Sequence, residues 1–492
     1  MIHHVEATSS ITKREPSLPP TPPVSLQTRS NEILDELTQQ FAVSTHKMRA
    51  IVSHFVSEMQ KGLQNEGETV AMIPTFVTGR PTGQEKGKYL ALDLGGTYLR
   101  VCEVSLHGNR DFGIHQQKYK VPGALKLGEM TQLCDFIAEC VNNFLSEQGH
   151  DDIDPEAPLQ LGFTFSFPVF QTSINRGVLK QWTKGFSCKN AVDKDVVVML
   201  QDAFSRKKVP VNIAAIVNDT VGTLMALGYR QPETAIGVIL GTGTNACYYE
   251  KIDKIQKWSG GKTAFEDMVI NTEWGMFDCE RTVLPLTIHD CKVDRESINP
   301  RQQMFEKMIS GMYLGEITRN CILHYVDRQM MFKGFSSTEL NQPYTFETEY
   351  MSTIQADDSS DLAETRHILE DVLKLPGTTL DDRRTVKAII ELVGRRAARL
   401  SACGLAAVME LSDVFHSGCT IAIDGSLYEH YPGFDNTMMQ ALIELYGPEI
   451  EAKISFSLAR DGSGLGAAIV AMIAHKAAQQ QQHQAEEHDS SL

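Results

Sequence analysis

The sequence predicts a two-lobed α/β protein whose β-sheet core is duplicated. Three observations support this prediction. The chain has 492 residues, which is too long for one ordinary core and suits two or three domains. Segments with strand and helix periodicity alternate along most of its length. Two strand–glycine turn–strand hairpins, at Gly95-Gly96 and Gly241-Thr242-Gly243, resemble each other and indicate an internal duplication.

The ends of the chain differ from its middle. Residues 1–28 hold closely spaced prolines among Ser and Thr, which predicts an extended, mobile tail. Residues 475–492 are polar and rich in Gln, so we expect a second disordered tail. Between the tails we expect one domain over residues 29–229, with the small lobe, and another over 231–474, with the large lobe.

The first elements lead into a hairpin. Apolar residues at helical spacing predict a helix from Ser30 to Gly62. Lys88–Leu94 then alternates as a strand, and Tyr98–Leu106 predicts a second strand. The glycines between them therefore form a hairpin turn, whereas a Rossmann or P-loop glycine turn leads into a helix. No Walker A motif is present, because Gln256 stands where its first glycine is required.

Later elements follow the same alternating plan. The predicted helices are Leu127–Glu147, Asp195–Arg206, Val386–Met409 and Ala467–Ala477. The predicted strands are Leu159–Thr164, Ile213–Asn218, Ile236–Leu240, Asn245–Glu250, Ala422–Asp424 and Ile454–Leu458. A glycine loop is expected over Asp461–Gly466.

The composition excludes several classes of protein. The formal net charge of -16 argues against binding nucleic acid or an anionic membrane, which both require a basic surface. The sequence has no run of 18 apolar residues that would predict a membrane span. Its N-terminal residues have no apolar core that would predict a secretion signal. The ten cysteines form no CxxC pair, so we expect reduced thiols in a cytoplasmic protein.

Three aspartates stand at predicted strand ends beside turn-forming residues: Asp93, Asp219 and Asp424. A single one would be an ordinary turn residue. Phosphoryl transfer, however, requires Mg²⁺ on carboxylate or water oxygens, donors around the phosphates, and a carboxylate that takes a hydroxyl proton. Three such aspartates, together with two glycine hairpins and Gly462-Ser463-Gly464-Leu465-Gly466, indicate a site of this kind.

The motifs resemble those of the hexokinase family. YLALDLGGTYLRV resembles its first phosphate loop, LGFTFSFPV and LKQWTKGF its sugar-binding signature, and IVNDTVGTLMALGY the segment with the catalytic Asp. LGTGTNACY, INTEWGMFD, FEKMISGMYLGE, RRAARLSACG, AIDGSLY and DGSGLGAA follow in the family's order. The resemblance runs from about Ser30 to about Ala474. It implies a two-lobed, actin-like ATPase fold of the ribonuclease H-like type with a cleft between the lobes, and ATP with Mg²⁺ as cofactors.

The resemblance implies a role for each matching residue. Asp219 would be the general base for the sugar 6-hydroxyl, although an Asx turn after Asn218 is the structural alternative. The sugar would bind Ser166, Phe167, Thr183, Lys184, Asn218, Asp219, Asn245, Glu273 and Glu306. The nucleotide would bind Asp93, Gly95, Gly96, Thr97, Arg100, Gly241, Thr242, Asp424, Gly425, Ser426, Gly462 and Gly464. Asp93 would position Mg²⁺ through water, and Trp182 and Phe186 would serve packing.

Three positions depart from the family's pattern. Tyr98 replaces the usual Asn after Gly-Gly-Thr, beside the phosphate loop. Arg301 replaces a Gly after Asn-Pro, where the backbone could require positive φ. Arg460 replaces an acidic residue before the last Asp-Gly-Ser-Gly. None of the three removes a predicted catalytic or sugar-contacting group.

The sequence leaves alternatives open. The favoured reading is a hexose kinase acting on glucose, fructose, mannose or N-acetylglucosamine, as a monomer or homodimer. A second reading is a hexokinase-like sugar-sensing regulator with weak or no catalysis, which Tyr98 supports and the intact Asp219 opposes. A third is another actin-like ATPase of motor or filament type, against which the Ser-Phe-Pro and Trp-Thr-Lys-Gly-Phe segments argue.

Overall fold

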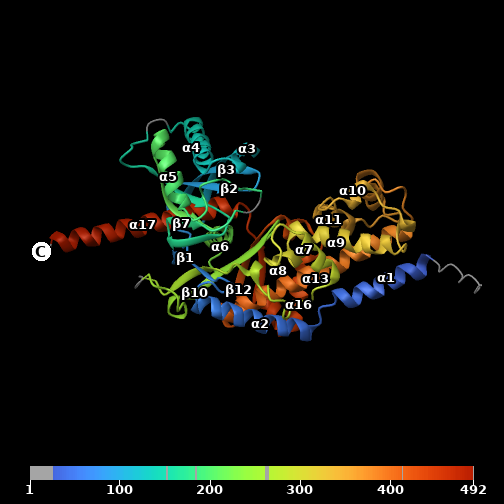
Figure 1. Ribbon diagram of the computed structural model, residues 1–492. Helices are drawn as coiled ribbons and strands as arrows, with labels where there is room; N and C mark the ends of the chain where they lie inside the picture. Colours follow the sequence, from blue (N-terminus) through green and yellow to red (C-terminus); the bar gives the residue numbers. More distant parts are fainter. Residues whose placement is uncertain (1–25, 151–152, 183–184, 261–264, 413, 491–492) are drawn as a thin grey trace, which may run out of the picture.

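Two α/β lobes stand side by side in the computed structural model (Figure 1). The structure describes residues 26–150, 153–182, 185–260, 265–412 and 414–490. Each lobe is built on one sheet, and the two sheets have five and six strands. Mixed sheets covered by helices are what alternating strand and helix periodicity predicts.

The small lobe is built on a five-stranded sheet in the order β4-β3-β2-β5-β8. Its strands are β2 (Lys86–Leu94), β3 (Tyr98–Gly108), β4 (Asp111–Lys120), β5 (Leu159–Thr164) and β8 (Val211–Val217). β2, β3 and β4 pair antiparallel, whereas β2, β5 and β8 run parallel. The hairpin β6 (Val169–Ser173) and β7 (Arg176–Leu179) lies outside this sheet.

Alternation along β2 gives the small lobe two cores, one on each face of the sheet. Leu90 and Leu92 pack with helices α4 (Met130–Glu147) and α5 (Val196–Lys207). Ala91, on the opposite face, packs with α17 (Gly462–Ser490), which in turn packs against α6 (Asp219–Arg230). The short helix α3 (Gly123–Leu127) precedes α4.

The large lobe is built on a six-stranded sheet in the order β1-β11-β10-β9-β12-β13. Its strands are β1 (Ile73–Thr78), β9 (Thr234–Leu240), β10 (Thr244–Lys251), β11 (Asp267–Asn271), β12 (Cys419–Asp424) and β13 (Ile454–Leu458). The long helix α13 (Leu380–Ser412) lies at the centre of this lobe and packs with α1 (Leu26–Phe41), α2 (Thr45–Gln64) and α16 (Phe434–Tyr446). The other helices are α7 (Ile288–Glu296), α8 (Met304–Ile309), α9 (Gly311–Asp327), α10 (Thr338–Asn341), α11 (Thr348–Ala356), α12 (Ala363–Arg366), α14 (Val414–Ser417) and α15 (Ser426–His430).

The two lobes exchange chain segments. α1, α2 and β1, from the start of the described chain, pack into the large lobe. α17, from its end, packs against strands β2, β5 and β8 of the small lobe. Each lobe therefore contains segments from both halves of the chain, so the expected boundary near residue 230 does not separate the lobes.

Several predicted elements differ from the structure. The single helix expected over residues 30–62 is two helices, because Ser44 caps α2 by accepting a hydrogen bond from the Lys47 N–H at 3.2 Å. Residues 26–28 are part of α1, where we expected a mobile tail. Residues 475–490 continue α17, where we expected a disordered tail. Ala, Gln and Glu favour the helix, and a helix that has already formed extends easily. Most of the expected glycine loop at Asp461–Gly466 is helical, because α17 begins at Gly462.

No helix in the described ranges is both long and apolar enough to cross a membrane. The ten cysteines are free thiols, as expected.

Candidate active site

The first glycine hairpin joins β2 to β3 and presents Asp93. The Gly95 N–H donates to the Tyr98 carbonyl at 3.0 Å and closes the turn. Asp93 lies opposite Arg100 in the strand register, and the Arg100 Nη2 is 3.3 Å from the Asp93 Oδ2. The Ser463 hydroxyl at the start of α17 donates to the same oxygen at 2.8 Å. Sequence reasoning did not single out Ser463, although it stands inside the predicted glycine segment.

The second hairpin joins β9 to β10 at Gly241 and is held by two other segments. The Gly311 N–H donates to the Gly241 carbonyl at 2.8 Å. On the other side, Gly425 has φ +124°, and a Cβ there would lie 2.3 Å from the Leu240 carbonyl oxygen. Glycine is therefore required at 425, because only glycine combines this backbone conformation with so close an approach.

Two aspartates converge between the hairpins. Asp219 opens α6 directly after β8, and the Asn218 side chain caps this helix by accepting from the Thr220 N–H at 3.0 Å. Asp424 ends β12. Burial, with a smaller contribution from the negative charge of Asp219, raises the pKa of Asp424 to about 6. A Cβ at Gly462 would lie 3.4 Å from the Asp424 Oδ2, so α17 also begins here.

A network of amides and carboxylates lies on the large-lobe side. The Asn245 amide donates to the Asn271 Oδ1 at 2.7 Å and to the Glu273 Oε1 at 3.3 Å. The Asn271 amide donates to the same Glu273 oxygen at 2.8 Å. The Glu306 Oε2 accepts from the Thr244 N–H at 3.0 Å. Three of the predicted sugar-binding residues, Asn245, Glu273 and Glu306, are thus anchored around the start of β10.

The small lobe contributes Ser166 after β5. The Phe165 N–H donates to the Val217 carbonyl at 3.0 Å, which brings the ends of β5 and β8 together and sets Ser166 near Asn218. The Phe167 ring is 4% exposed and packs against Trp182 and Phe186 at centroid distances of 5.0 and 5.3 Å. The Phe167 side chain is therefore part of an aromatic packing cluster. Trp182 and Phe186 serve packing, as expected.

Thr183 and Lys184, which the sequence assigned to the sugar, lie outside the described residues.

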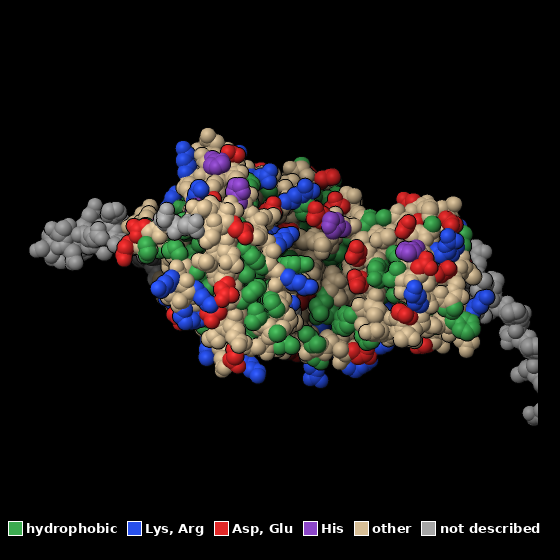
Figure 2. Space-filling model, turned by 90° about the horizontal axis from the view of Figure 1, so that it is seen from above, with side chains coloured by type: hydrophobic (Ala, Val, Ile, Leu, Met, Phe, Trp, Pro, Cys, Tyr) green, Lys and Arg blue, Asp and Glu red, His purple; other side chains and the backbone are tan. Residues whose placement is uncertain are grey.

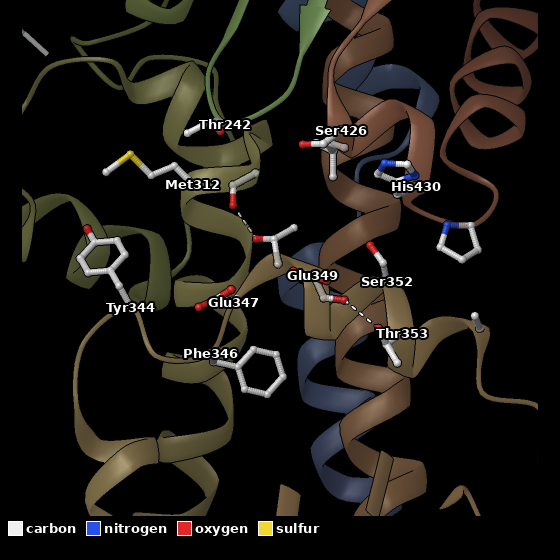
Figure 3. A pocket seen from close by; sticks show the side chains of 15 residues that line it. Thr242, Met312, Tyr344, Phe346, Glu347, Glu349, Ser352, Thr353, Ser426 and His430 are labelled. Atoms are coloured by element: carbon white, nitrogen blue, oxygen red, sulfur yellow. Dashed lines mark hydrogen bonds between the residues drawn. The ribbon is translucent and has the colours of Figure 1, made fainter. Parts of the chain in front are cut away.

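A cavity of about 930 Å³ adjoins the second hairpin. Thr242 and Ser426, two predicted nucleotide contacts, stand together at one end of it (Figure 3). Glu347, Phe346 and Tyr344 line the opposite part, and the Thr348 hydroxyl donates to the Gly311 carbonyl at 2.6 Å. Seen from above, the surface dips between the lobes, and charged side chains of both signs border the dip (Figure 2).

The carboxylates fit a magnesium ion that is shared with phosphates. Within the described residues, no cluster of three His, Cys, Asp or Glu side chains forms a metal cage. Mg²⁺ commonly keeps several waters and binds one or two carboxylates plus substrate phosphates. Asp93 and Asp424, one beside each glycine hairpin, provide carboxylates of that kind.

The three departures from the family pattern lie at different distances from the site. Tyr98 begins β3 at the first hairpin and is 50% exposed. Arg301 has φ +66°, the positive value expected at this position. Arg460 lies on the surface, 76% exposed, with its guanidinium 3.7 Å from Glu429.

These features define a class of protein: two α/β lobes, each with a glycine hairpin, and aspartates between them make a phosphotransferase of the two-lobed ATPase type. Comparison with known proteins identifies the family within this class. Hexokinase family models match residues 33–229 and 235–473. The chain belongs to the hexokinase family.

Curated relatives match almost the whole chain. The hexokinase of Kluyveromyces lactis is 43% identical, over 90% of this chain and 92% of that protein. Hexokinase-1 of Saccharomyces cerevisiae is 42% identical, over 90% and 93%, and the glucokinase of Aspergillus niger is 40% identical, over 91% and 98%. A solved structure of Schistosoma mansoni hexokinase complexed with glucose matches with a TM-score of 0.83 and 36% identity, over 91% of this chain and 99% of that one. The chain is thus an ATP-dependent hexose phosphotransferase with the predicted fold.

Proposed function

We propose that this protein transfers the γ-phosphoryl group of Mg-ATP to the 6-hydroxyl of a hexose, with Asp219 as the general base. The convergence of Asp219 and Asp424 between the two glycine hairpins supports this proposal most directly. Asp219 is the first residue of α6, directly after Asn218 at the end of β8. A carboxylate there can accept the hydroxyl proton.

The sugar is held by groups that match its hydroxyls. Asn245, Glu273 and Glu306 supply acceptors and a donor from the large lobe, and Ser166 and Asn218 add groups from the small lobe. Thr183 and Lys184 complete the proposed set. A hexose is discriminated in this way because any hydroxyl that is missing leaves a buried polar group unpaired.

The phosphates lie between the hairpins. The backbone N–H groups of Gly96 and Thr97 face them from one lobe, beside Gly95, and that of Thr242 faces them from the other, beside Gly241. Arg100 adds a positive charge, and the N-terminus of α17, at Gly462 and Gly464, adds further donors. When bound, Mg²⁺ neutralises charge on the phosphate oxygens. Asp93, through water, is the residue that positions it.

The nucleoside occupies the cavity beside Asp424, Gly425 and Ser426. Sugar binding then swings the small lobe onto the large lobe. This closure excludes water, which would otherwise accept the phosphoryl group. We expect the protein to act in the cytoplasm, as a monomer or homodimer.

The first test is a kinase assay. Purified protein is incubated with Mg-ATP and, separately, glucose, fructose, mannose or N-acetylglucosamine, while ADP and the sugar 6-phosphate are followed. We expect turnover with at least one sugar, and loss of that turnover in Asp219→Ala. Equal turnover in Asp219→Ala would remove Asp219 as the base.

The same assay separates the kinase from a regulator. Measurable sugar binding without turnover of any sugar would indicate a sugar-sensing protein instead. The sequence identity to curated kinases and the intact Asp219 favour the kinase.

A further inference from the structure

Asn271 is the last residue of β11 and lies beside two of the proposed sugar ligands, Asn245 and Glu273. The residue is 6% exposed and lies opposite Cys247 of β10 and Ile73 of β1 in the strand register. Its amide therefore sits between two neighbouring strands, where a buried polar group requires partners. Sequence reasoning assigned it no role.

Every partner of the Asn271 amide belongs to the sugar-binding set. Its Oδ1 accepts from the Asn245 amide at 2.7 Å and from the Glu273 N–H at 3.4 Å. Its Nδ2 donates to the Glu273 Oε1 at 2.8 Å. A single amide thus fixes one side chain through its acceptor and the other through its donor.

The backbone of Glu273 shows why such support is required. Its φ and ψ are 54° and 44°, the left-handed conformation that is unfavourable for a residue with a side chain. The Asn271 Oδ1 meets the N–H two residues on, which is the contact of an Asx turn. Asn271 therefore stabilises both the backbone and the carboxylate of Glu273.

Asn245 is committed to the same network. Its Nδ2 donates to Asn271 and Glu273, and its Oδ1 accepts from the Ala246 N–H at 2.8 Å and the Thr272 hydroxyl at 3.3 Å. An amide has two donor hydrogens, so the contacts with Asn271 and Glu273 use both hydrogens of Asn245. A sugar hydroxyl that accepts a hydrogen bond from Asn245 must displace one of these two contacts. The contact with Asn271 is the shorter one, so we expect it to keep the amide in place when the sugar binds.

We propose that Asn271 is a positioning residue that orients Asn245 and Glu273 toward the sugar hydroxyls. This inference rests on the proposed function, because it takes those two residues as sugar ligands. Asn271 acts through them and touches no reacting atom.

The test compares Asn271→Ala with a matched control, Asn320→Ala. Asn320 is also a buried asparagine of the large lobe, 3% exposed, and it donates to a glutamate, Glu316, at 3.3 Å. We expect Asn271→Ala to raise the KM for the sugar by about 10- to 100-fold, the range for a hydrogen bond to a charged group. The KM for Mg-ATP should stay within about twofold, and Asn320→Ala should leave both constants unchanged.

A pH profile distinguishes positioning from a structural role. Asn271→Asp keeps the acceptor for Asn245 but sets a second carboxylate against the Glu273 Oε1. Two carboxylates at such a distance share a proton, which raises the pKa of one of them. The KM for the sugar in Asn271→Asp should therefore rise with pH as that proton is lost, whereas in Asn271→Ala it should follow the wild-type profile.

A double substitution completes the test. If Asn271 acts partly through Glu273, Asn271→Ala should raise the sugar KM by a smaller factor in a Glu273→Ala background than in the wild type, because only its contact with Asn245 remains. Full additivity of the two changes, or equal increases in the KM for sugar and for Mg-ATP, would overturn the inference while leaving the kinase activity established. A wild-type protein without turnover would instead overturn the proposed function.

Discussion

Replacing Gly466 by alanine tests how closely catalysis depends on the contact between α6 and α17. An alanine Cβ at 466 would lie 1.9 Å from the Gly222 carbonyl oxygen and 2.4 Å from its carbonyl carbon. Non-bonded carbon atoms pack at about 3.5–4.0 Å, so the shortfall exceeds about 1 Å. Both partners are helix backbone, so no side-chain rotation relieves the overlap, and the helices must separate.

The separation reaches the proposed base directly. Gly222 lies one turn after Asp219 in α6, so moving α6 by about 1 Å moves the Asp219 carboxylate by a similar amount. Misplacement on this scale costs on the order of 100-fold in rate. Overpacking should also lower the free energy of unfolding by about 1–3 kcal/mol.

Steady-state kinetics and denaturant unfolding measure the two effects. The matched control is Gly228→Ala in the same helix, where the nearest atom to the new Cβ is a ring carbon of Pro81 at 3.3 Å. We expect kcat to fall about 100-fold in Gly466→Ala and to stay within about twofold in Gly228→Ala. If Gly466→Ala kept a kcat within about threefold of the wild-type value, the close contact of these helices would not govern the position of Asp219.

Three further predictions follow from single groups. The pKa of Asp424 is about 6 in the folded protein and 3.8 for an ordinary Asp, so between these pH values the folded state holds a proton that the unfolded chain releases. The free energy of unfolding of the unliganded protein should therefore fall as pH rises from about 4 to 6. Asp424→Asn should remove that slope in denaturant titrations. Asp290 pairs with Arg396 in the core through two hydrogen bonds of 2.6 and 2.7 Å, so Asp290→Ala should lower the free energy of unfolding by about 3–5 kcal/mol. Asp135→Ala, at an exposed pair with Arg206, should lower it by less than about 1 kcal/mol. Equal losses of stability in the two variants would contradict the role of burial. Tyr98→Asn should change the free energy of unfolding by less than about 0.5 kcal/mol and lower the KM for Mg-ATP, and an unchanged KM would show that this side chain does not meet the phosphates.

Strand periodicity and turn chemistry were sufficient to predict most of the sheet strands. The β2–β3 and β9–β10 hairpins lie where the glycines predict them, because an alternating run that ends at glycine has few other structures available. The three aspartates could be found for the same reason: each follows or ends a strand, at the edge where α/β proteins bind ligands.

Glycine also produced the main error. Gly462, Gly464 and Gly466 predict a loop, because glycine disfavours helices by about 1 kcal/mol each. The structure places them in the first turns of α17, where Gly466 meets the backbone of Gly222. These glycines are needed for close packing between helices, and a single sequence does not reveal which distant backbone a glycine approaches.

Asn271 could not be predicted for a related reason. It is an ordinary asparagine at the end of a strand, and its role depends on Asn245, 26 positions earlier in the chain. Only pairing of β10 with β11 brings the two amides together. Side-chain networks of this kind depend on strand register, which periodicity leaves open.

The position of α17 has a consequence for synthesis on the ribosome. Its apolar residues, among them Leu465, Ile469 and Val470, cover one face of a sheet whose last strand, β8, ends at Val217. Translation at about 5–20 residues per second leaves that face without its cover for roughly 12 to 50 seconds. The nascent small lobe thus exposes apolar surface until the end of the chain emerges, so a chaperone that shields it in this interval should determine how much protein reaches the folded state.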